Sequence, residues 1–380
     1  MLKTLYDIDI LILGGGCTGL SLAYYLSYLP NKCNILIIEN KTLYHNDKTW
    51  CGWRTKNHAF ITCCTIFWYS FYIKKAKPYY SIINSSIPYE YIRSIFFYKK
   101  ILNRITNISN IQYYKNKIIN IKEYKNYISI KLNTGKYTNA RWVIDTIPKQ
   151  IKIYSPWQWQ TFFGIELYFN NIFKNFSKPY LMNFYLTKYL KSNNFNFIYI
   201  LPIKKNKVLF EWTIFSNKDI FIINNLLIFY INMKIGIHNY KILRKETGHI
   251  PMAYIKNQTK INHLAKLYGC YIRTSNGFSF HQIQQWAIKG AYNISINKKL
   301  IIPNIHYFFI FLDYIFMRTI ERYPNISLLL YNNIFYYINS NSLIYFFTNT
   351  STILDILNIV LFIKPKVFLL YTIFMNLFNN

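Results

Sequence analysis

Three glycines near the N-terminus have the spacing that a phosphate-binding turn requires. Gly14, Gly16 and Gly19 form a G-x-G-x-x-G pattern, and Glu39 lies twenty residues after the last of them. In such a turn the first glycine permits a tight bend, the second lets the backbone approach a pyrophosphate, and the third lets a helix pack closely on a strand. An acid at the distance of Glu39 accepts hydrogen bonds from ribose hydroxyls. The spacing therefore predicts that these four residues bind a dinucleotide.

The segments around these glycines favour the same interpretation. An apolar run, Ile8 to Leu13, precedes them. A helical segment from Cys17 to Leu29 follows and is closed by Pro30, and a second apolar run, Ile35 to Ile38, leads to the acid. This order is typical of a dinucleotide-binding β-α-β unit, in which the helix N-terminus presents free N–H groups to phosphate. An ordinary glycine turn in an α/β protein is the alternative that the sequence leaves open.

A single acid within an aromatic and apolar run is the second candidate for chemistry. Glu211 lies in the segment Val208 to Ser216, and the whole chain has only 14 Asp and Glu residues. In a strand its two neighbours, Phe210 and Trp212, face the opposite side. Burial in such surroundings disfavours the carboxylate, so the pKa rises and a proton stays available near neutral pH. Glu211 is therefore predicted to be an acid catalyst, and an edge-strand acid facing water is the alternative.

Farther along the chain, a hairpin indicates how the elements are organised. Residues Tyr127 to Leu132 alternate in polarity, residues 133–136 form a turn, and a second run ends at Asp145. This pattern reads as a β-hairpin that returns to a parallel sheet, as in two-lobed flavin-binding proteins. The expected fold class is α/β, a Rossmann-like FAD-binding fold with an interleaved mixed-sheet substrate lobe. Asp145, at the strand end, either contacts the cofactor or caps the strand.

The distribution of these segments predicts three ranges. Residues 1–150 are expected to form the FAD-binding core with its hairpin insertion. Residues 151–260 are rich in strand patterns, which suit an antiparallel sheet forming a substrate lobe. Residues 261–380 return to the FAD-binding lobe and continue as an apolar, largely helical region. No flexible linker separates the lobes, so we expect them to be interleaved.

Composition argues against nucleic acid as the partner. The chain carries 45 Lys and Arg residues against 14 Asp and Glu, a formal charge of +31, which would normally suggest a polyanion. The basic residues are scattered, however, and the chain is rich in residues with A/T-rich codons, so a biased genome explains the charge. No stretch of about 20 residues lacks charged or polar residues. The two best candidates for a membrane-spanning helix are interrupted, one by Asp313 and the other by Lys364 and Lys366.

The expected location follows from the same features. An amphipathic contact in the plane of a membrane remains compatible with the sequence, and the first predicted strand begins too early to leave room for a leader segment. The six cysteines form no C-x-x-C pattern, and His249, His263 and His281 lie in no known zinc motif. We therefore expect free thiols, no metal, and a cytoplasmic protein associated peripherally with a membrane.

Five ordered blocks of the sequence resemble the FAD-dependent lycopene cyclases, a carotenoid-forming family. The N-terminal block joins the glycine-rich segment and IIEN to HNDKTWCGW at residues 45–53. The other four are VLFEWTIFS (208–216), GHIPM (248–252), IRTSNGFSF (272–280) and FFIFLDYIFMR (308–318). Their order and spacing fit over essentially the whole chain, so the resemblance is far more specific than a glycine turn.

This resemblance implies an activity and a set of partners. It implies lycopene as substrate, reduced FAD as cofactor, NADPH as the reductant of the flavin, and ring closure without net redox change. Glu211 would protonate a terminal double bond of the polyene. Asn276 and Gly277 lie in the block that the family places near the flavin, so both are expected to bind the cofactor, as is Asp145.

The chain also departs from the family pattern. Thr274, Asn276 and Phe278 stand where the family usually has proline, threonine and tyrosine. The paired acids of plant members are reduced to Glu211, which is followed by Trp212. Two alternatives stay open: an FAD-dependent redox enzyme acting on an isoprenoid or aromatic substrate, and a degenerate, non-catalytic protein that binds a membrane surface or nucleic acid.

Four further residues each carry two interpretations. Asp47 is a turn residue or part of the site, and Trp50 and Trp53 pack in the core or line the polyene. Asp313, in an apolar helix, is a buried hydrogen-bonding residue or an acid in the substrate cavity. For Asp313 the structural interpretation is favoured.

Overall fold

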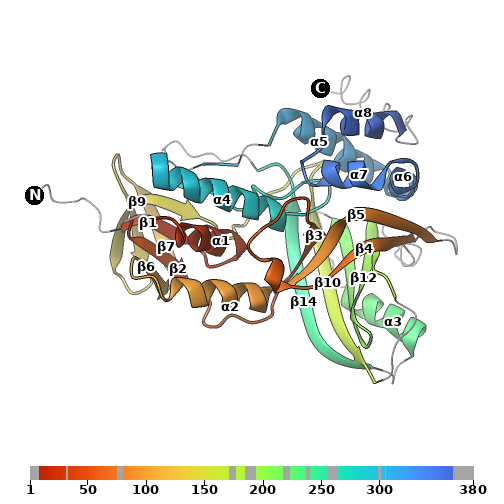
Figure 1. Cartoon of the computed structure of the whole chain (residues 1–380), viewed down its shortest axis with the longest axis horizontal. Helices are drawn as coiled ribbons and strands as arrows, with labels where there is room; N and C mark the ends of the chain where they lie inside the picture. The colour runs from red at the N-terminus through yellow and green to blue at the C-terminus, as the bar shows by residue number, and fades with distance from the viewer. Residues whose placement is uncertain are drawn as a thin grey trace, which may run out of the picture.

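The structure is a computed structural model that describes residues 8–30, 33–74, 80–170, 177–184, 194–216, 223–236, 240–255, 263–297, 301–303 and 305–362. The strands of these residues form two sheets that lie side by side, with helices covering their faces (Figure 1). The interruptions expected at Lys364 and Lys366 lie outside the described residues.

The first sheet is the nucleotide-binding sheet expected from the glycine turn. Its strands run in the order β6-β2-β1-β9-β8-β7, and β15 also pairs with β9. They are β1 (Ile8–Leu13), β2 (Ile35–Glu39), β6 (Ile111–Lys115), β7 (Ile118–Glu123), β8 (Ile128–Leu132), β9 (Tyr137–Asp145) and β15 (Leu264–Lys266). Strands β1, β2 and β6 are mutually parallel, and β9 joins β1 in parallel with Leu13 opposite Asp145.

The predicted hairpin is confirmed. β8 and β9 pair antiparallel, and the C-terminal half of β9 then lies beside β1 and β15. Leu11 and Leu13 of β1 share a buried cluster with Ile128 and Ile130 of β8, so the hairpin covers one face of the parallel strands. The two faces of the parallel strands are therefore both buried, which explains their nearly continuous apolar sequences.

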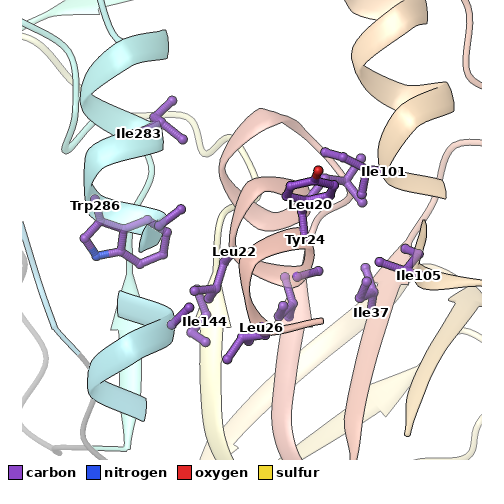
Figure 2. Packing of buried hydrophobic residues seen from close by; sticks show 14 of the residues in the cluster. Leu20, Leu22, Tyr24, Leu26, Ile37, Ile101, Ile105, Ile144, Ile283 and Trp286 are labelled. Carbon is purple, nitrogen blue, oxygen red and sulfur yellow. The ribbon is translucent and has the colours of Figure 1, made fainter. Parts of the chain in front are cut away.

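Three helices cover the opposite face: α1 (Cys17–Leu26), α2 (Ser94–Ile105) and α4 (Phe280–Asn297). α1 lies between the other two helices, and most of its residues are buried. A helix buried in this way carries apolar side chains around most of its circumference. Buried residues of this layer are shown in Figure 2: Leu20, Leu22, Tyr24, Leu26, Ile37, Ile101, Ile105, Ile144, Ile283 and Trp286. α1 ends at Leu26, three residues before the predicted end, because residues 27–29 form a tighter turn.

The second sheet has eight strands in the order β14-β10-β13-β12-β11-β4-β5-β3. They are β3 (Thr49–Trp53), β4 (Cys64–Lys74), β5 (Tyr80–Arg93), β10 (Gln158–Phe169), β11 (Tyr180–Asn183), β12 (Asn196–Lys204), β13 (Lys207–Ser216) and β14 (Tyr240–Met252). All neighbours pair antiparallel except β11 and β4, which are parallel, so the sheet is mixed as expected.

Helices cover both faces of this sheet. α3 (Ile223–Ile235) packs on the face that carries Phe210 and Trp212. The other face packs against α5 (Tyr307–Arg322), α6 (Pro324–Tyr337), α7 (Ser340–Phe347) and α8 (Ile353–Phe362). Figure 1 shows these four C-terminal helices gathered on the side of the second sheet away from α3. A short 3₁₀ helix, Ile61–Cys63, precedes β4.

One part of the expected division needs correction. Strands β3, β4 and β5 lie within residues 1–150, assigned above to the cofactor-binding core, but they pair in the eight-stranded sheet. Pairing between distant segments leaves no local signal in sequence, and a strand looks alike in either sheet. Within the described residues, no helix is long and apolar enough to cross a membrane.

Candidate functional site

The glycine turn at the end of β1 has the backbone that its sequence predicts. Gly14 has φ +96°, in the left-handed region, and a Cβ there would lie 2.7 Å from Oγ1 of Thr146. A Cβ on Gly19 would lie 2.2 Å from the carbonyl oxygen of Gly14, so α1 packs directly on the turn. A Cβ on Gly16 would meet no atom within 4 Å. The space beside Gly16 is therefore open to a ligand.

The N-terminus of α1 adds donors to this open space. Gly16 is the N-cap residue, no side chain caps the helix, and its first turn contains no acid. The first N–H groups and the positive end of the helix dipole are therefore left for an anion. Open space, free N–H groups and a tight turn together fit the pyrophosphate of a dinucleotide.

Glu39 lies at the end of β2, directly beside the turn. Its Oε2 accepts a hydrogen bond from the Gly15 N–H at 2.5 Å, and its Oε1 accepts one from the Lys41 N–H at 2.8 Å. Tyr44, which the sequence did not single out, donates its hydroxyl proton to the Gly15 carbonyl at 2.9 Å. Both contacts of this carboxylate are with backbone N–H groups, and its binding of ribose hydroxyls stays a prediction.

Asp145 lies at the end of β9, opposite Leu13, and is buried. Its carboxylate accepts a hydrogen bond from the Ile147 N–H at 3.1 Å and forms an ion pair with Lys149 at 2.5 Å. Both contacts are those of a strand-end cap, and a contact with a cofactor stays a prediction.

A cavity of about 370 Å³ lies on the face of the eight-stranded sheet that meets the loop before α4. Three of the residues predicted to act as acid or to bind the cofactor line it: Glu211 on β13, and Asn276 and Gly277 in the loop. Pro148, just beyond the end of β9, lines the side nearest the nucleotide-binding sheet. Other lining residues come from β3, β5, β10, β12 and β14: Thr49, Trp50, Cys51, Tyr89, Gln160, Phe162, Tyr199, Leu201, Gly248, His249 and Ile250.

The loop before α4 is shaped by its own hydrogen bonds. Gly277 has φ +76°, and a Cβ there would lie 2.8 Å from Oε1 of Gln160. Asn276 accepts a hydrogen bond from the Phe278 N–H at 3.0 Å and donates one to the Phe347 carbonyl, also at 3.0 Å. Its side-chain amide therefore holds the loop to α7, while the backbone of Gly277 faces the cavity.

Glu211 is half-buried and turned toward the cavity together with Leu209. Phe210 and Trp212 face the other side and pack near α3, as the strand periodicity predicts. Burial, followed by the nearby charge of Glu246, raises the pKa of Glu211 to about 8. The carboxyl group therefore holds a proton at neutral pH and presents it to the cavity.

An aromatic pocket adjoins this cavity and shares Gln160, Tyr199, Asn276 and Phe278 with it. Its free volume is about 20 Å³, and its further lining is mostly aromatic: Trp53, Phe197, Phe215, Tyr331, Phe335 and Phe347. Trp50 lines the larger cavity and stacks on Phe280 with ring centroids 5.6 Å apart. Trp50 and Trp53 therefore each pack against other aromatic side chains and also line a cavity.

Asp313 on α5 has the structural role that the sequence favours. It is buried, lies 2.8 Å from Nη2 of Arg273, and accepts a hydrogen bond from the Thr274 hydroxyl at 2.6 Å. The Arg273 guanidinium also lies over the rings of Phe309 and Phe346. Asp313 thus fixes the loop before α4 to the C-terminal helices. Asp47 instead forms an ion pair with Lys41 at 2.6 Å.

A cluster of His58, Glu90 and His281 lies close to the cavity, behind Phe280. Both imidazole Nε2 atoms lie near one oxygen of Glu90, at 2.9 and 3.1 Å, and Arg54 lies 2.8 Å from the other. Nδ1 of His58 accepts the Phe60 N–H, so its Nε2 carries the proton and donates to Glu90. This arrangement is a hydrogen-bonded hub around one carboxylate.

Comparison with known proteins places this site in context. The profile of the lycopene cyclase protein family matches residues 9–300. A search of curated proteins finds no match. A geranylgeranyl bacteriochlorophyll reductase-like protein from Thermoplasma acidophilum superposes with a TM-score of 0.65 at 13% identity, over 95% of this chain and 97% of that one.

Two other solved structures are similar in fold. The p-nitrophenol 4-monooxygenase PnpA of Pseudomonas putida DLL-E4 gives a TM-score of 0.57 at 8% identity, over 98% of both chains. The flavin-dependent monooxygenase PieE, solved with FAD and substrate, gives 0.56 at 9% identity, over 77% of this chain and 58% of that one. At such identities the likeness shows the fold alone, which is the expected Rossmann-like FAD-binding fold. Because the family profile covers most of the chain, the protein belongs to the lycopene cyclase family.

Proposed function

We propose that the protein is a lycopene cyclase that closes a linear end of lycopene into a β-ring with no net redox change. One observation carries this proposal: the carboxyl group of Glu211, whose pKa burial raises to about 8, faces a cavity beside the loop at Asn276 and Gly277. Ring closure of this kind needs an acid, a cavity that tolerates a cation, and a base. It needs no oxidant, because the proton that enters at one carbon leaves from another.

Glu211 is the acid in this mechanism. Its proton adds to a terminal double bond and leaves a carbocation. The π electrons of the next double bond along the chain then form a C–C bond to the cationic carbon, which closes the ring and moves the positive charge onto it. Aromatic rings of the cavity, among them Trp50, Tyr89 and Phe278, stabilise the cation by about 0.5–2 kcal/mol each. A proton then passes from the ring to a base, a role open to the Glu211 carboxylate left by the first step, which forms the product and restores the charge balance. Water would trap the cation as an alcohol, so ring closure requires that the bound polyene displace water from around the reacting end.

FAD fits the described residues as cofactor. Its pyrophosphate would lie at Gly14, Gly16 and Gly19, with a ribose at Glu39, and its ring system would lie near Asn276 and Gly277. When bound and reduced, with NADPH as reductant, the flavin supplies an electron-rich ring beside the reacting end. Supporting observations are the open space at Gly16 and the uncapped N-terminus of α1.

Product mass tests this proposal. Purified protein with reduced FAD and lycopene is expected to yield β-ring carotenoid of unchanged mass. Glu211→Gln is expected to retain flavin and to lower the rate by about 10²–10⁴-fold, because the amide has no acidic proton. Tyr137→Phe, far from the cavity and exposed on β9, is the control and should leave the rate unchanged. A normal rate in Glu211→Gln would remove this residue from the acid role.

An FAD-dependent reductase of an isoprenoid chain is the second candidate. The geranylgeranyl bacteriochlorophyll reductase-like protein shares the fold over 95% of this chain, so a reductase is compatible with this fold. A reductase adds two hydrogens and consumes one NADPH for each double bond that it reduces. Steady NADPH oxidation coupled to a heavier product would therefore replace the cyclase proposal with this one, and absence of any product would favour a degenerate protein.

Membrane contact is part of the same proposal, because the substrate is an apolar polyene. Exposed apolar side chains lie on α5 and α8, on the side of the second sheet away from α3 (Figure 1): Tyr307, Phe311, Ile353, Leu354, Leu357 and Leu361. An apolar helix face of this kind can lie in the lipid interface. Leu354→Asn with Leu357→Asn is expected to weaken co-sedimentation with neutral lipid vesicles, whereas Tyr137→Asn should not.

A further inference from the structure

Two acids and a glycine lie in one row across the eight-stranded sheet. Gly164 on β10 pairs with Glu211 on β13 on one side and with Glu246 on β14 on the other. Directly paired residues of antiparallel strands project to the same face. The carboxyl groups of Glu211 and Glu246 therefore share a face, and the residue between them has no side chain.

The side chain of Glu246 occupies the space above this glycine. A Cβ on Gly164 would lie 3.0 Å from Cγ of Glu246 and 3.3 Å from its Oε1. Oε2 of Glu246 accepts hydrogen bonds from Arg244 at 2.6 Å and from the Thr49 hydroxyl at 3.0 Å. Oε1 is buried and has no hydrogen-bond partner among the described residues. One oxygen of Glu246 is thus anchored, and the other lies over the gap beside Glu211.

We propose that Glu246 is a positioning residue that keeps Glu211 in its proton-donating form, and that Gly164 is the gap across which the two carboxyl groups act on each other. The proposal rests on the acid role of Glu211 proposed above. Glu246 does not line the cavity, so it would act only through Glu211. Glu246 forms an ion pair with Arg244 at 2.6 Å, and an acidic neighbour of this kind disfavours a negative charge on Glu211.

The other titratable and charged groups near Glu211 do not replace this effect. They come from the strands and the segment packed around it: Lys48, Cys51 on β3, Tyr89 on β5, Tyr199 on β12 and Arg244 on β14. Burial raises the pKa of Cys51, Tyr89 and Tyr199 well above the usual range, so these three stay neutral. Lys48 and Arg244 favour the ionised form of Glu211. Among Lys48, Arg244 and Glu246, only Glu246 favours the protonated form of Glu211.

Infrared difference titration of the purified full chain tests the proposal without relying on activity. The carbonyl band of a protonated carboxyl group that disappears in Glu211→Gln belongs to Glu211, and in the wild type it should titrate near pH 8. In Glu246→Gln the midpoint is expected to fall by at least about one pH unit, a tenfold change in the ratio of the two forms. An unchanged midpoint, or no titrating band in the wild type, would overturn the proposal.

Glu166→Gln is the matched control. Glu166 lies on β10, two residues from Gly164, and also pairs with Arg244 at 3.3 Å. Glu166→Gln removes one carboxylate partner of Arg244 but leaves Glu246 in place. The titration midpoint of Glu211 should therefore stay near the wild-type value. If Glu246→Gln does not fold, Glu246→Asp retains the ion pair and moves the charge back by one methylene. The titration midpoint of Glu211 is then expected to fall by less than in Glu246→Gln. An unchanged midpoint in Glu246→Asp would contradict the proposal.

Rate measurements separate this inference from the proposed function. If lycopene is cyclised, the alkaline limit of the rate should move to lower pH in Glu246→Gln, as the infrared midpoint does. If lycopene is not cyclised and the band still shifts, the proposed function fails and the coupling of the two acids stands. If cyclisation proceeds and neither the band nor the limit moves, the role of Glu246 fails and the function stands.

Discussion

At the residue scale, the surroundings of one carboxyl group decide its chemistry. Glu211 holds a proton at pH 7 because burial and the charge of Glu246 raise its pKa to about 8. Activity that depends on this proton should be constant below that pH and fall above it, as the acid ionises. Initial rates of cyclisation between pH 6 and 10, with flavin reduction followed by absorbance, should show a one-proton decrease about pH 8. A rate that keeps rising through this range would contradict the role of Glu211.

The glycines of the turn serve different purposes, and their variants should separate folding from cofactor binding. Gly16 has φ −83° and open space around its Cβ position, so Gly16→Ala should fold normally and lose FAD affinity where the pyrophosphate approaches. Gly19→Ala places its Cβ 2.2 Å from the Gly14 carbonyl, and such overpacking costs about 1–3 kcal/mol. Thermal unfolding and flavin content of both variants check this. Equal loss of stability in the two would contradict it.

At the scale of elements, α5 carries two ion pairs that differ in burial. Asp313 and Arg273 are both buried. Asp313→Asn leaves the buried charge of Arg273 without a partner, so it should lower the free energy of unfolding by about 3–5 kcal/mol. Arg318 and Glu321, on the same helix, are partly exposed, and Glu321→Gln should cost less than about 1 kcal/mol. Urea unfolding measures both. Equal costs would show that Asp313 does not hold the loop before α4 to the helices.

At the scale of the whole molecule, the hub around Glu90 joins β5 to the start of α4. Hydrogen bonds from His281 and His58 outweigh the effect of burial and lower the pKa of Glu90 to about 2. An acid with a depressed pKa stabilises the fold above its ordinary value of 4.5, and this contribution is lost as the pH falls toward 2.

His281 changes the stability in the same direction. Burial lowers its pKa below 6.5, so on acidification the unfolded chain takes up a proton before the folded one does. We therefore expect the free energy of unfolding to fall from pH 6.5 downward and to fall further below pH 4.5. Urea midpoints measured from pH 7 to 4 test this, with Glu90→Gln as the variant that should show a flatter dependence. A stability that rises on acidification would be the contrary result.

How much of the site could be predicted depends on how local each signal is. Gly14, Gly16 and Gly19 could be placed at the turn after β1 because their residue type and spacing are properties of six consecutive residues. Thr146 and Tyr44 could not, because they meet the turn only through sheet pairing and side-chain packing.

The sequence by itself determined the β-α-β unit, the hairpin that returns to the parallel sheet, and the alternation that turns Glu211 away from Phe210 and Trp212. Each follows from periodicity and backbone preference within a short segment. Only the tertiary structure assigned β3, β4 and β5 to the second sheet and placed Gly164 between Glu211 and Glu246. These arrangements depend on which distant strands pair and in which register, and a strand's own residues do not encode its partner.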